Sequence, residues 1–316
     1  MAVYVNTNYS ALQGQRYLGN VQNQLTTTYQ RLSSGMRINS AKDDAAGLQI
    51  SDRLTSQING LNQGNRNASD GIALAQTAEA GMDEVSGMLQ KIRTLAVQAS
   101  NGTNTLSDRQ ALAKEASSLA TEISRIATQT TYGGKTILEG QQNDTSAIFS
   151  KAGNANDVGK AGTVTLQVGS NKGDTISMQI ASMVFSKIGS AAGLADTDFA
   201  DAAGTAAFVK DGNGGIKVNF TTAGSPDAII EMMDKMIGQV DGQRANLGAI
   251  QNRLESSIRN QSNVAANEAD ARSRIRDADF AQESANLTQQ NIIQQAASSM
   301  LMQANTRPQL GLSLIG

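Results

Sequence analysis

The chain of 316 residues contains no cysteine, no histidine and no tryptophan, and only 3% of its residues are aromatic. Without cysteine it can form no disulfide, thiol nucleophile or thiolate metal site, and without histidine it lacks the commonest metal ligand and general base. The sequence therefore predicts no catalytic residue, no metal site and no cofactor. Because aromatic side chains supply much of the volume of a thick core, their scarcity favours a thin, elongated architecture.

Excess charge of one sign and long apolar runs are missing too. The formal net charge of −2 gives no overall attraction to nucleic acid or to an anionic membrane surface. No run of roughly 18 apolar residues occurs, and no basic stretch followed by an apolar stretch opens the sequence. We expect no nucleic-acid partner, no membrane insertion and no cleavable signal peptide. A cytoplasmic location and export by a route without a cleavable signal both fit.

The two ends of the chain carry very few charges. Residues 284–316 contain only Arg307, and residues 1–41 contain only Arg16, Arg31 and Arg37. Apolar residues recur at helical spacing in both segments, at seven-residue intervals in the first, which predicts two amphipathic helices with uncharged polar faces. The predicted apolar positions are Ala11, Leu18, Val21, Leu25, Leu32, Leu287, Ile292, Ile293, Ala296, Met300 and Leu301.

Two such helices leave much apolar surface in water if they pair only with each other. We therefore expect many copies of the chain to bring these ends together in a shared core, so that the protein is a homopolymer. The alternative is that the terminal helices complete the bundle of one subunit. We favour self-assembly because a monomer has no reason to lack charge at both ends.

The segments next to the ends predict long charged helices. From about residue 45 to residue 100 apolar residues lie three or four apart, and the part from Leu54 to Ala99 alone would span roughly 70 Å at 1.5 Å per residue. A turn follows, with Ser107 as the predicted N-cap of a third helix that ends before Tyr132. Another helix starts at Pro226, in a first-turn position that tolerates proline.

Residues between these helices change character, because glycine and small polar residues increase and apolar residues alternate. Two hairpins are predicted. Their apolar residues are Val164, Leu166 and Val168 with Ile176, Met178 and Ile180, and Phe208 with Ile216, Val218 and Phe220. The stretch 190–204 has no assignable pattern, and Gly134, Lys135 and Thr136 are interpreted as turn residues because the rest of a phosphate-loop motif is missing.

The predicted fold is mainly α, with long antiparallel helical rods of coiled-coil or bundle type formed by the N- and C-terminal segments and a small β-rich inserted outer domain. The terminal segments 1–42 and 271–316 form the two halves of an inner-core helical domain. Segments 43–140 and 226–270 form the rod domain, and 141–225 is the variable insert.

Several long runs resemble bacterial flagellin. They are RLSSGMRINSAKDDAAGLQISDRL (31–54), LQKIRTLAVQASNGTNT (89–105), NLGAIQNRL (246–254) and SRIRDADFAQESANLTQQNIIQQAASSMLMQAN (273–305). The resemblance covers roughly the first 140 and the last 90 residues and is far more specific than a short motif. It implies a structural subunit of the flagellar filament, exported through the flagellar type III apparatus to an extracellular location.

The resemblance also implies partners. These are an export chaperone at residues 284–316, the filament cap and hook-associated proteins, and host flagellin receptors. For a surface receptor the matching positions are Lys91, Arg93, Leu95, Gln98 and Glu115. For cytosolic sensors they are Leu312, Leu314 and Ile315.

Two other functions remain as alternatives to a filament subunit. One is a hook-filament junction protein, which would share the terminal helices but be made in few copies. The other is a secreted adhesin or effector whose activity lies in the insert. The zinc protease that some flagellins carry in the insert needs a histidine-based motif, which this chain cannot form.

Overall fold

The computed structural model describes residues 7–141, 148–149, 160–194, 207–210, 215–221 and 225–312, with the side chains of residue 210 and residues 307–312 left out of the description. These residues form two compact units. The terminal unit comprises Met1–Asn59 and Asn263–Gly316, and the central unit comprises Gly60–Ser262. Helices α2 (Ala45–Ser100) and α5 (Ser225–Arg276) contribute residues to both units. The five segments predicted from the sequence stay a prediction.

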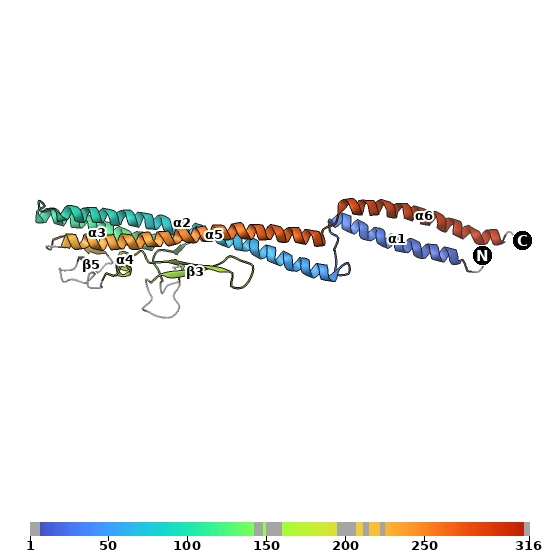
Figure 1. The fold of residues 1–316 in the computed structure, drawn as a ribbon, viewed down its shortest axis with the longest axis horizontal. Helices are drawn as coiled ribbons and strands as arrows, with labels where there is room; N and C mark the ends of the chain where they lie inside the picture. The colour runs from blue at the N-terminus through green and yellow to red at the C-terminus, as the bar shows by residue number, and fades with distance from the viewer. Residues whose placement is uncertain are drawn as a thin grey trace. The chain divides into compact units, whose positions relative to one another are not determined.

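The terminal unit contains helices α1 (Tyr9–Ser34) and α6 (Phe280–Leu312), which run antiparallel beside each other (Figure 1). The Asn8 side chain caps α1 by accepting a hydrogen bond from the Ala11 backbone nitrogen at 3.1 Å. Gly35 ends the helix with a φ of 70°, a left-handed conformation that favours glycine. Both ends of α1 are thus capped by neighbouring residues.

The turn that leads from α1 to α2 is held by two aspartates, Asp43 and Asp44. Asp43 Oδ2 accepts hydrogen bonds from the backbone nitrogens of Ser40 at 3.0 Å and Asn39 at 3.1 Å. These bonds, the one from Ser40 first, lower the pKa of Asp43 because they stabilise the carboxylate form. Asp44 Oδ1 accepts from the backbone nitrogen of Gly47 at 2.9 Å in the first turn of α2.

Helices α5 and α6 are separated by a short break at Asp277–Asp279. The carbonyl of Arg276, the last residue of α5, accepts a hydrogen bond from the Arg37 backbone nitrogen at 2.7 Å. Met36 pairs with Asp277 in an antiparallel bridge. The end of α1 and the start of α6 are thereby tied together through the backbone.

The central unit is built on α2, α5 and α3 (Leu106–Gln129). The predicted N-cap of α3 is wrong: Thr105 caps the helix, not Ser107. Thr105 and Asp108 form a capping box, in which each side chain bonds the backbone nitrogen of the other residue. The hydroxyl of Thr105 also donates to Asp108, and this bond is the first cause of a lowered pKa for Asp108.

Polar pairs define the register of α2 against α5 in the central unit. The later a residue comes in α2, the earlier its partner comes in α5, so the two helices run antiparallel. The pairs are Asp83 with Arg244 at 2.9 Å, Glu79 with Gln251 at 2.9 Å and Arg93 with Asp234 at 2.6 Å. The antiparallel rods predicted from the sequence are therefore present.

The described part of the insert contains two two-stranded antiparallel sheets and one short helix, and a further two-stranded sheet at residues 131–136 precedes it. The elements are β1 (Thr131–Tyr132) with β2 (Lys135–Thr136), β3 (Gly162–Gln167) with β4 (Thr175–Ile180), α4 (Phe185–Ala191), and β5 (Phe208–Lys210) with β6 (Ile216–Val218). Both predicted hairpins are confirmed. Gly133 and Gly134 form the β1–β2 turn with positive φ, so the turn prediction is confirmed for Gly134, but it is wrong for Lys135 and Thr136, which form β2. Helix α4 was not predicted, and residues 211–214 of the second hairpin lie outside the described part.

The insert shares one hydrophobic core with the rods. Phe185, Phe208 and Phe220 are fully buried in the same cluster as Met82 of α2 and Met233 of α5. The rings of Phe185 and Phe208 meet edge to face, with centroids 5.2 Å apart. These three phenylalanines thus fill the place where the insert meets thin, alanine-rich helices.

Helix α2 presents glycines to the β3–β4 hairpin. A Cβ added at Gly60 would lie 2.7 Å from Ser170 Cβ, and one added at Gly64 would lie 2.0 Å from the Val168 carbonyl oxygen. At Gly71 it would lie 2.2 Å from Leu166 Cδ1. At Gly64 the hairpin backbone therefore packs directly against the helix backbone, which only glycine permits, whereas the contact at Gly71 is with the end of a side chain.

Candidate assembly surface

The facing sides of α1 and α6 carry most of the apolar residues predicted from the heptads. Val21 is buried at 4% exposure. The half-buried positions are Ala11, Leu18, Leu25, Leu32, Leu287, Ile293 and Leu301. A Cβ added at Gly14 would lie 3.2 Å from Leu301 Cδ1, so the two helices approach closely there. The apolar seam thus holds the pair together.

The seam also contains polar contacts that set its register. Thr28, which is buried, donates a hydrogen bond from Oγ1 to Gln290 Oε1 at 3.0 Å. Arg31 pairs with the buried Glu283 at 3.2 Å. A shift of one helix along the other would break both contacts and leave the buried Glu283 without its partner, and such a shift is therefore disfavoured.

The α1–α6 pair leaves large apolar side chains exposed to solvent. Three of the predicted positions, Ile292, Ala296 and Met300, are exposed, with Ile292 at 62% and Met300 at 70%. Further large apolar residues of α1 and α6 are exposed but were not among the apolar positions predicted from helical spacing. They are Tyr9, Leu12, Tyr17, Tyr29, Phe280 and Met302. We call this set, together with Ile292, Ala296 and Met300, the assembly surface.

A groove of about 930 Å³ runs between α1 and α6 within this surface. Tyr17 and Gly14 line it from α1, and Ile293, Ala296 and Met300 line it from α6. None of the lining residues that the structure describes is charged. An apolar side chain with neighbouring amide or hydroxyl groups could enter the groove without the cost of burying a charge.

The positions matched to a surface receptor lie in the central unit and are engaged within the chain. Lys91 Nζ lies 3.1 Å from Glu115 Oε1, so two of them pair with each other. Arg93 bonds Asp234, and this hydrogen bond raises the pKa of the Arg93 guanidinium. Leu95 is buried at 7% exposure, whereas Gln98 is exposed. Contact with a receptor stays a prediction.

The positions matched to cytosolic sensors lie at the end of the chain. Leu312 is the last residue of α6, but its side chain is outside the description. Leu314 and Ile315 lie outside the described residues altogether.

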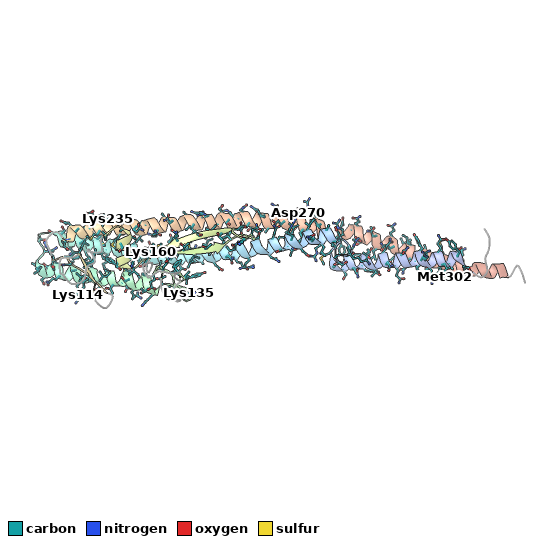
Figure 2. All side chains as sticks on the ribbon, turned by 90° about the horizontal axis from the view of Figure 1, so that it is seen from below. Lys114, Lys135, Lys160, Lys235, Asp270 and Met302 are labelled. Carbon is teal, nitrogen blue, oxygen red and sulfur yellow. The ribbon has the colours of Figure 1, made fainter. Side chains whose placement is uncertain are left out.

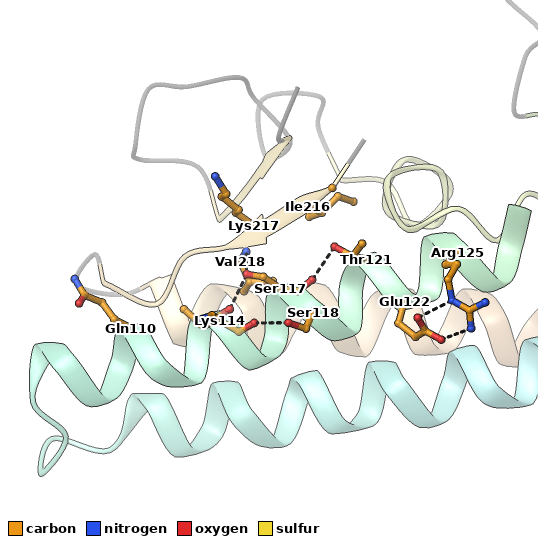
Figure 3. A pocket seen from close by; sticks show the side chains of 12 residues that line it. Gln110, Lys114, Ser117, Ser118, Thr121, Glu122, Arg125, Ile216, Lys217 and Val218 are labelled. Atoms are coloured by element: carbon orange, nitrogen blue, oxygen red, sulfur yellow. Dashed lines mark hydrogen bonds and ion pairs between the residues drawn. The ribbon is translucent and has the colours of Figure 1, made fainter. Parts of the chain in front are cut away.

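A second groove, of about 690 Å³, lies between α3 and β6 in the central unit (Figure 3). The backbone nitrogen of Val218 donates to Ser117 Oγ at 2.8 Å and ties the strand to the helix at its floor. Arg125 and Glu122 at its edge bond each other, which raises the pKa of the arginine and lowers that of the glutamate. The charged groups at this edge thus neutralise each other.

Metal and membrane binding have no candidate in the described part of the chain. Among those residues, no three acidic side chains gather in a way that could hold a metal ion. The described helices also include none with a stretch apolar enough, over sufficient length, to cross a bilayer. The assembly surface is therefore the strongest candidate for function.

Comparisons with known proteins agree with the resemblance. The family model for the bacterial flagellin N-terminal helical region matches residues 5–143, and the model for the C-terminal helical region matches residues 230–315. Flagellin B of Vibrio anguillarum is 37% identical over 382 aligned residues, covering 100% of both chains. Flagellin B of Vibrio cholerae serotype O1 (strain ATCC 39541 / Classical Ogawa 395 / O395) is 38% identical over 378 residues, again covering 100% of both.

Among solved structures, a putative flagellar hook-associated protein from Vibrio parahaemolyticus is similar with a TM-score of 0.52 and 15% identity. The match covers 74% of this chain and 100% of that chain, and at this identity it supports the fold alone. The two family models together match more than half of the sequence, and the curated relatives match all of it. This chain belongs to the bacterial flagellin family.

Proposed function

We propose that the chain is a structural subunit that polymerises with copies of itself into the bacterial flagellar filament, and that the assembly surface joins the copies. One observation carries the proposal: α1 and α6 pair with each other, yet Tyr9, Ile292 and Met300 are at least 62% exposed. Large exposed apolar patches mark sites of protein association, and the described helices include none that is long and apolar enough to cross a membrane.

The polar composition of the same helices supports burial on all sides. Between them, α1 and α6 contain only Arg16, Arg31, Glu283 and Arg307 as charged residues. Their other polar residues are amides and hydroxyls, which are far less costly to bury than charges when they find partners. A surface that must meet neighbouring copies in a water-poor core requires this composition. The family is structural, and we propose no enzymatic activity for the chain.

An uncovered apolar surface needs protection before assembly. We therefore propose that an export chaperone covers residues 284–316, and that the chain leaves the cell through the flagellar type III apparatus to become extracellular. The filament cap and hook-associated proteins are proposed as partners at the filament ends. Host flagellin receptors are proposed as further partners through Lys91, Arg93 and Glu115 on the rods and through the C-terminal residues.

Deletion of residues 284–316 tests the proposal directly. The shortened chain lacks nearly all of α6 and half of the assembly surface. We expect no polymer in electron micrographs after seeding with filament fragments, while circular dichroism still shows the helices of the central unit. Filaments of normal length from the shortened chain would overturn the proposal.

A single substitution tests whether an apolar residue matters for polymerisation because it lies in the assembly surface or merely because it is exposed. Ile292→Asp places a charge where a neighbouring copy must pack, and we expect the protein concentration needed for polymerisation to rise at least about tenfold. Leu106→Asp is the matched control, because Leu106 is 61% exposed but lies at the start of α3, outside the assembly surface. Equal effects of the two substitutions would contradict the assignment.

The same micrographs distinguish the alternative functions. Long helical filaments support a filament subunit. Short assemblies that form only at filament ends would favour a hook-associated junction protein, and a chain that stays monomeric would favour an adhesin or effector.

A further inference from the structure

The methionines of this chain are distributed unevenly between core and solvent. Of the methionines that the structure describes, Met82, Met178, Met183, Met233 and Met236 are at most 1% exposed. Met36, Met88 and Met232 are half-buried. Met300 and Met302 are 70% and 67% exposed, and both belong to the assembly surface of α6. The exposed thioethers in the described part are thus confined to the helix on which polymerisation is proposed to depend.

The composition makes these two side chains the preferred targets of a mild oxidant. Cysteine, histidine and tryptophan, which would otherwise compete for it, are absent from the sequence. Methionine oxidation follows exposure, and the buried thioethers of the rods are protected by their packing. A limited dose of hydrogen peroxide should therefore react first at Met300 and Met302.

The reaction is a two-electron oxygen transfer. A lone pair of the thioether sulfur attacks one peroxide oxygen, the O–O bond breaks, and an S–O bond forms. The sulfur is oxidised to a sulfoxide, hydrogen peroxide is reduced, and the second oxygen leaves as water after proton transfer. Each methionine consumes one peroxide, and methionine sulfoxide reductases reverse the change with a thiol reductant, one enzyme for each sulfoxide epimer.

The product no longer suits the surface on which it lies. Met300 lines the uncharged groove between α1 and α6, and Met302 (Figure 2) projects from the same helix. A sulfoxide is a strong hydrogen-bond acceptor, and burying it against an apolar neighbour without a donor is unfavourable. The helix backbone has no need to change, because both side chains point into solvent in the single chain.

We propose that Met300 and Met302 are oxidation sites that control assembly: their sulfoxides block polymerisation of the free chain, and polymerisation shields the thioethers from oxidant. This inference rests on the proposed function. It makes the chain sensitive to peroxide before assembly and resistant afterwards, and the block is reversible by enzymatic reduction.

The test uses the full-length chain, hydrogen peroxide and seeded polymerisation. Peptide mass spectrometry on the monomer should show oxidation of Met300 and Met302 about tenfold faster than that of Met82 or Met233. The oxidised chain should need about tenfold more protein to form sedimentable polymer, with unchanged helix content. Treatment with both sulfoxide reductases should restore polymerisation, and preformed filaments should resist oxidation at the two sites.

Two variants decide whether these methionines are responsible. The M300L/M302L variant is compared with its own untreated yield, and peroxide should no longer reduce that yield. Met88→Leu is the control, because it removes a half-buried thioether from the rods and leaves α6 intact, so its polymerisation should still be lost on oxidation. If the double variant remains as sensitive as the parent chain, or if reductases fail to rescue the oxidised parent, the inference is overturned.

Failure of the proposed function looks different. In that case the untreated parent chain would not polymerise on any seed, and the proposed control of polymerisation by oxidation would fail as well. The oxidation rates of the monomer would then still show whether Met300 and Met302 are the preferred sites.

Discussion

Gly64 lies where helix α2 meets the backbone of the β3–β4 hairpin. A Cβ at this position would lie 2.0 Å from the Val168 carbonyl oxygen and 2.7 Å from its carbonyl carbon. Backbone atoms cannot rotate away as a side chain can. Gly64→Ala therefore requires the hairpin to retreat until the new contact reaches the ordinary range that begins at 3.4 Å, a movement of more than 1 Å.

The expected loss of stability in Gly64→Ala follows from the side chains that the hairpin packs against the rods. Val168 and the half-buried Leu166 pack with Leu254 in a satellite cluster between the hairpin and the rods. A gap of 0.5–1 Å already removes about a quarter to a half of the contact energy, and a fully buried Val or Leu contributes about 1.5–3 kcal/mol. The retreat should thus cost about 2–3 kcal/mol. Replacing glycine by alanine in a helix returns about 1 kcal/mol, so the net destabilisation should be about 1–2 kcal/mol.

The assay compares three substitutions in one helix. Gly87 has nothing within 4 Å of an added Cβ, so Gly87→Ala should stabilise the chain by up to about 1 kcal/mol. Gly71 faces the end of the Leu166 side chain, which can rotate, so Gly71→Ala should be close to neutral. Urea unfolding followed by circular dichroism gives the free energy of unfolding. Hydrogen exchange at the Val168 amide, which donates to the Asp174 carbonyl at 2.9 Å, reports the hairpin itself.

The reasoning is refuted if Gly64→Ala is as stable as Gly87→Ala and its Val168 amide exchanges as slowly as in the parent chain. The close approach of hairpin and helix would then not require glycine at this position.

Further predictions concern the caps and the terminal seam. Thr105→Ala removes the N-cap of α3 and should cost about 1 kcal/mol in urea unfolding. The bonds to Thr105 lower the pKa of Asp108 in the folded chain, so the contribution of Asp108 to stability is present above the pKa of the unfolded state, near pH 4, and is lost as the pH falls through the folded value. In Thr105→Ala an NMR titration should place the Asp108 pKa closer to 3.8. An unchanged titration would contradict the role of the cap. Arg31→Met leaves the buried Glu283 carboxylate unpaired and should destabilise the α1–α6 pair by about 1–3 kcal/mol. The double change Arg31→Met/Glu283→Leu should recover most of that loss in thermal melts, and a double variant as unstable as the single one would argue against the pairing.

Local patterns predicted the helices well because each helix depends on residues close in sequence. The apolar spacing from residue 45 to residue 100 matches α2, and Pro226 lies in the first turn of α5 as predicted. The N-cap of α3 was assigned to Ser107 because serine is a good cap, but Thr105 has Asp108 three residues later and so completes a capping box. That signal was present in the sequence.

Contacts over long distances in sequence could not be predicted in this way. Gly64 and Val168 are separated by more than a hundred residues, and helical spacing alone does not say which glycine meets which strand. Helix α4 was missed because its seven residues are too few for a helical period to stand out. On α1 and α6, spacing selected Val21 and Ile292 alike, although one is 4% and the other 62% exposed. When apolar residues cover more than one face of a helix, their spacing does not show which face packs against the partner helix.

The common core of rods and insert limits how the variable segment can be exchanged. Removing it would uncover buried residues such as Met82 and Met233 on the rods and leave Gly60, Gly64 and Gly71 facing water as weak points in a long helix. A foreign epitope placed across the whole of residues 141–225 should therefore give a poorly folded carrier. The tip of the β3–β4 hairpin, around Gly173 with its φ of 96°, offers a better place for display, because an addition there leaves the paired strands and their glycine contacts untouched.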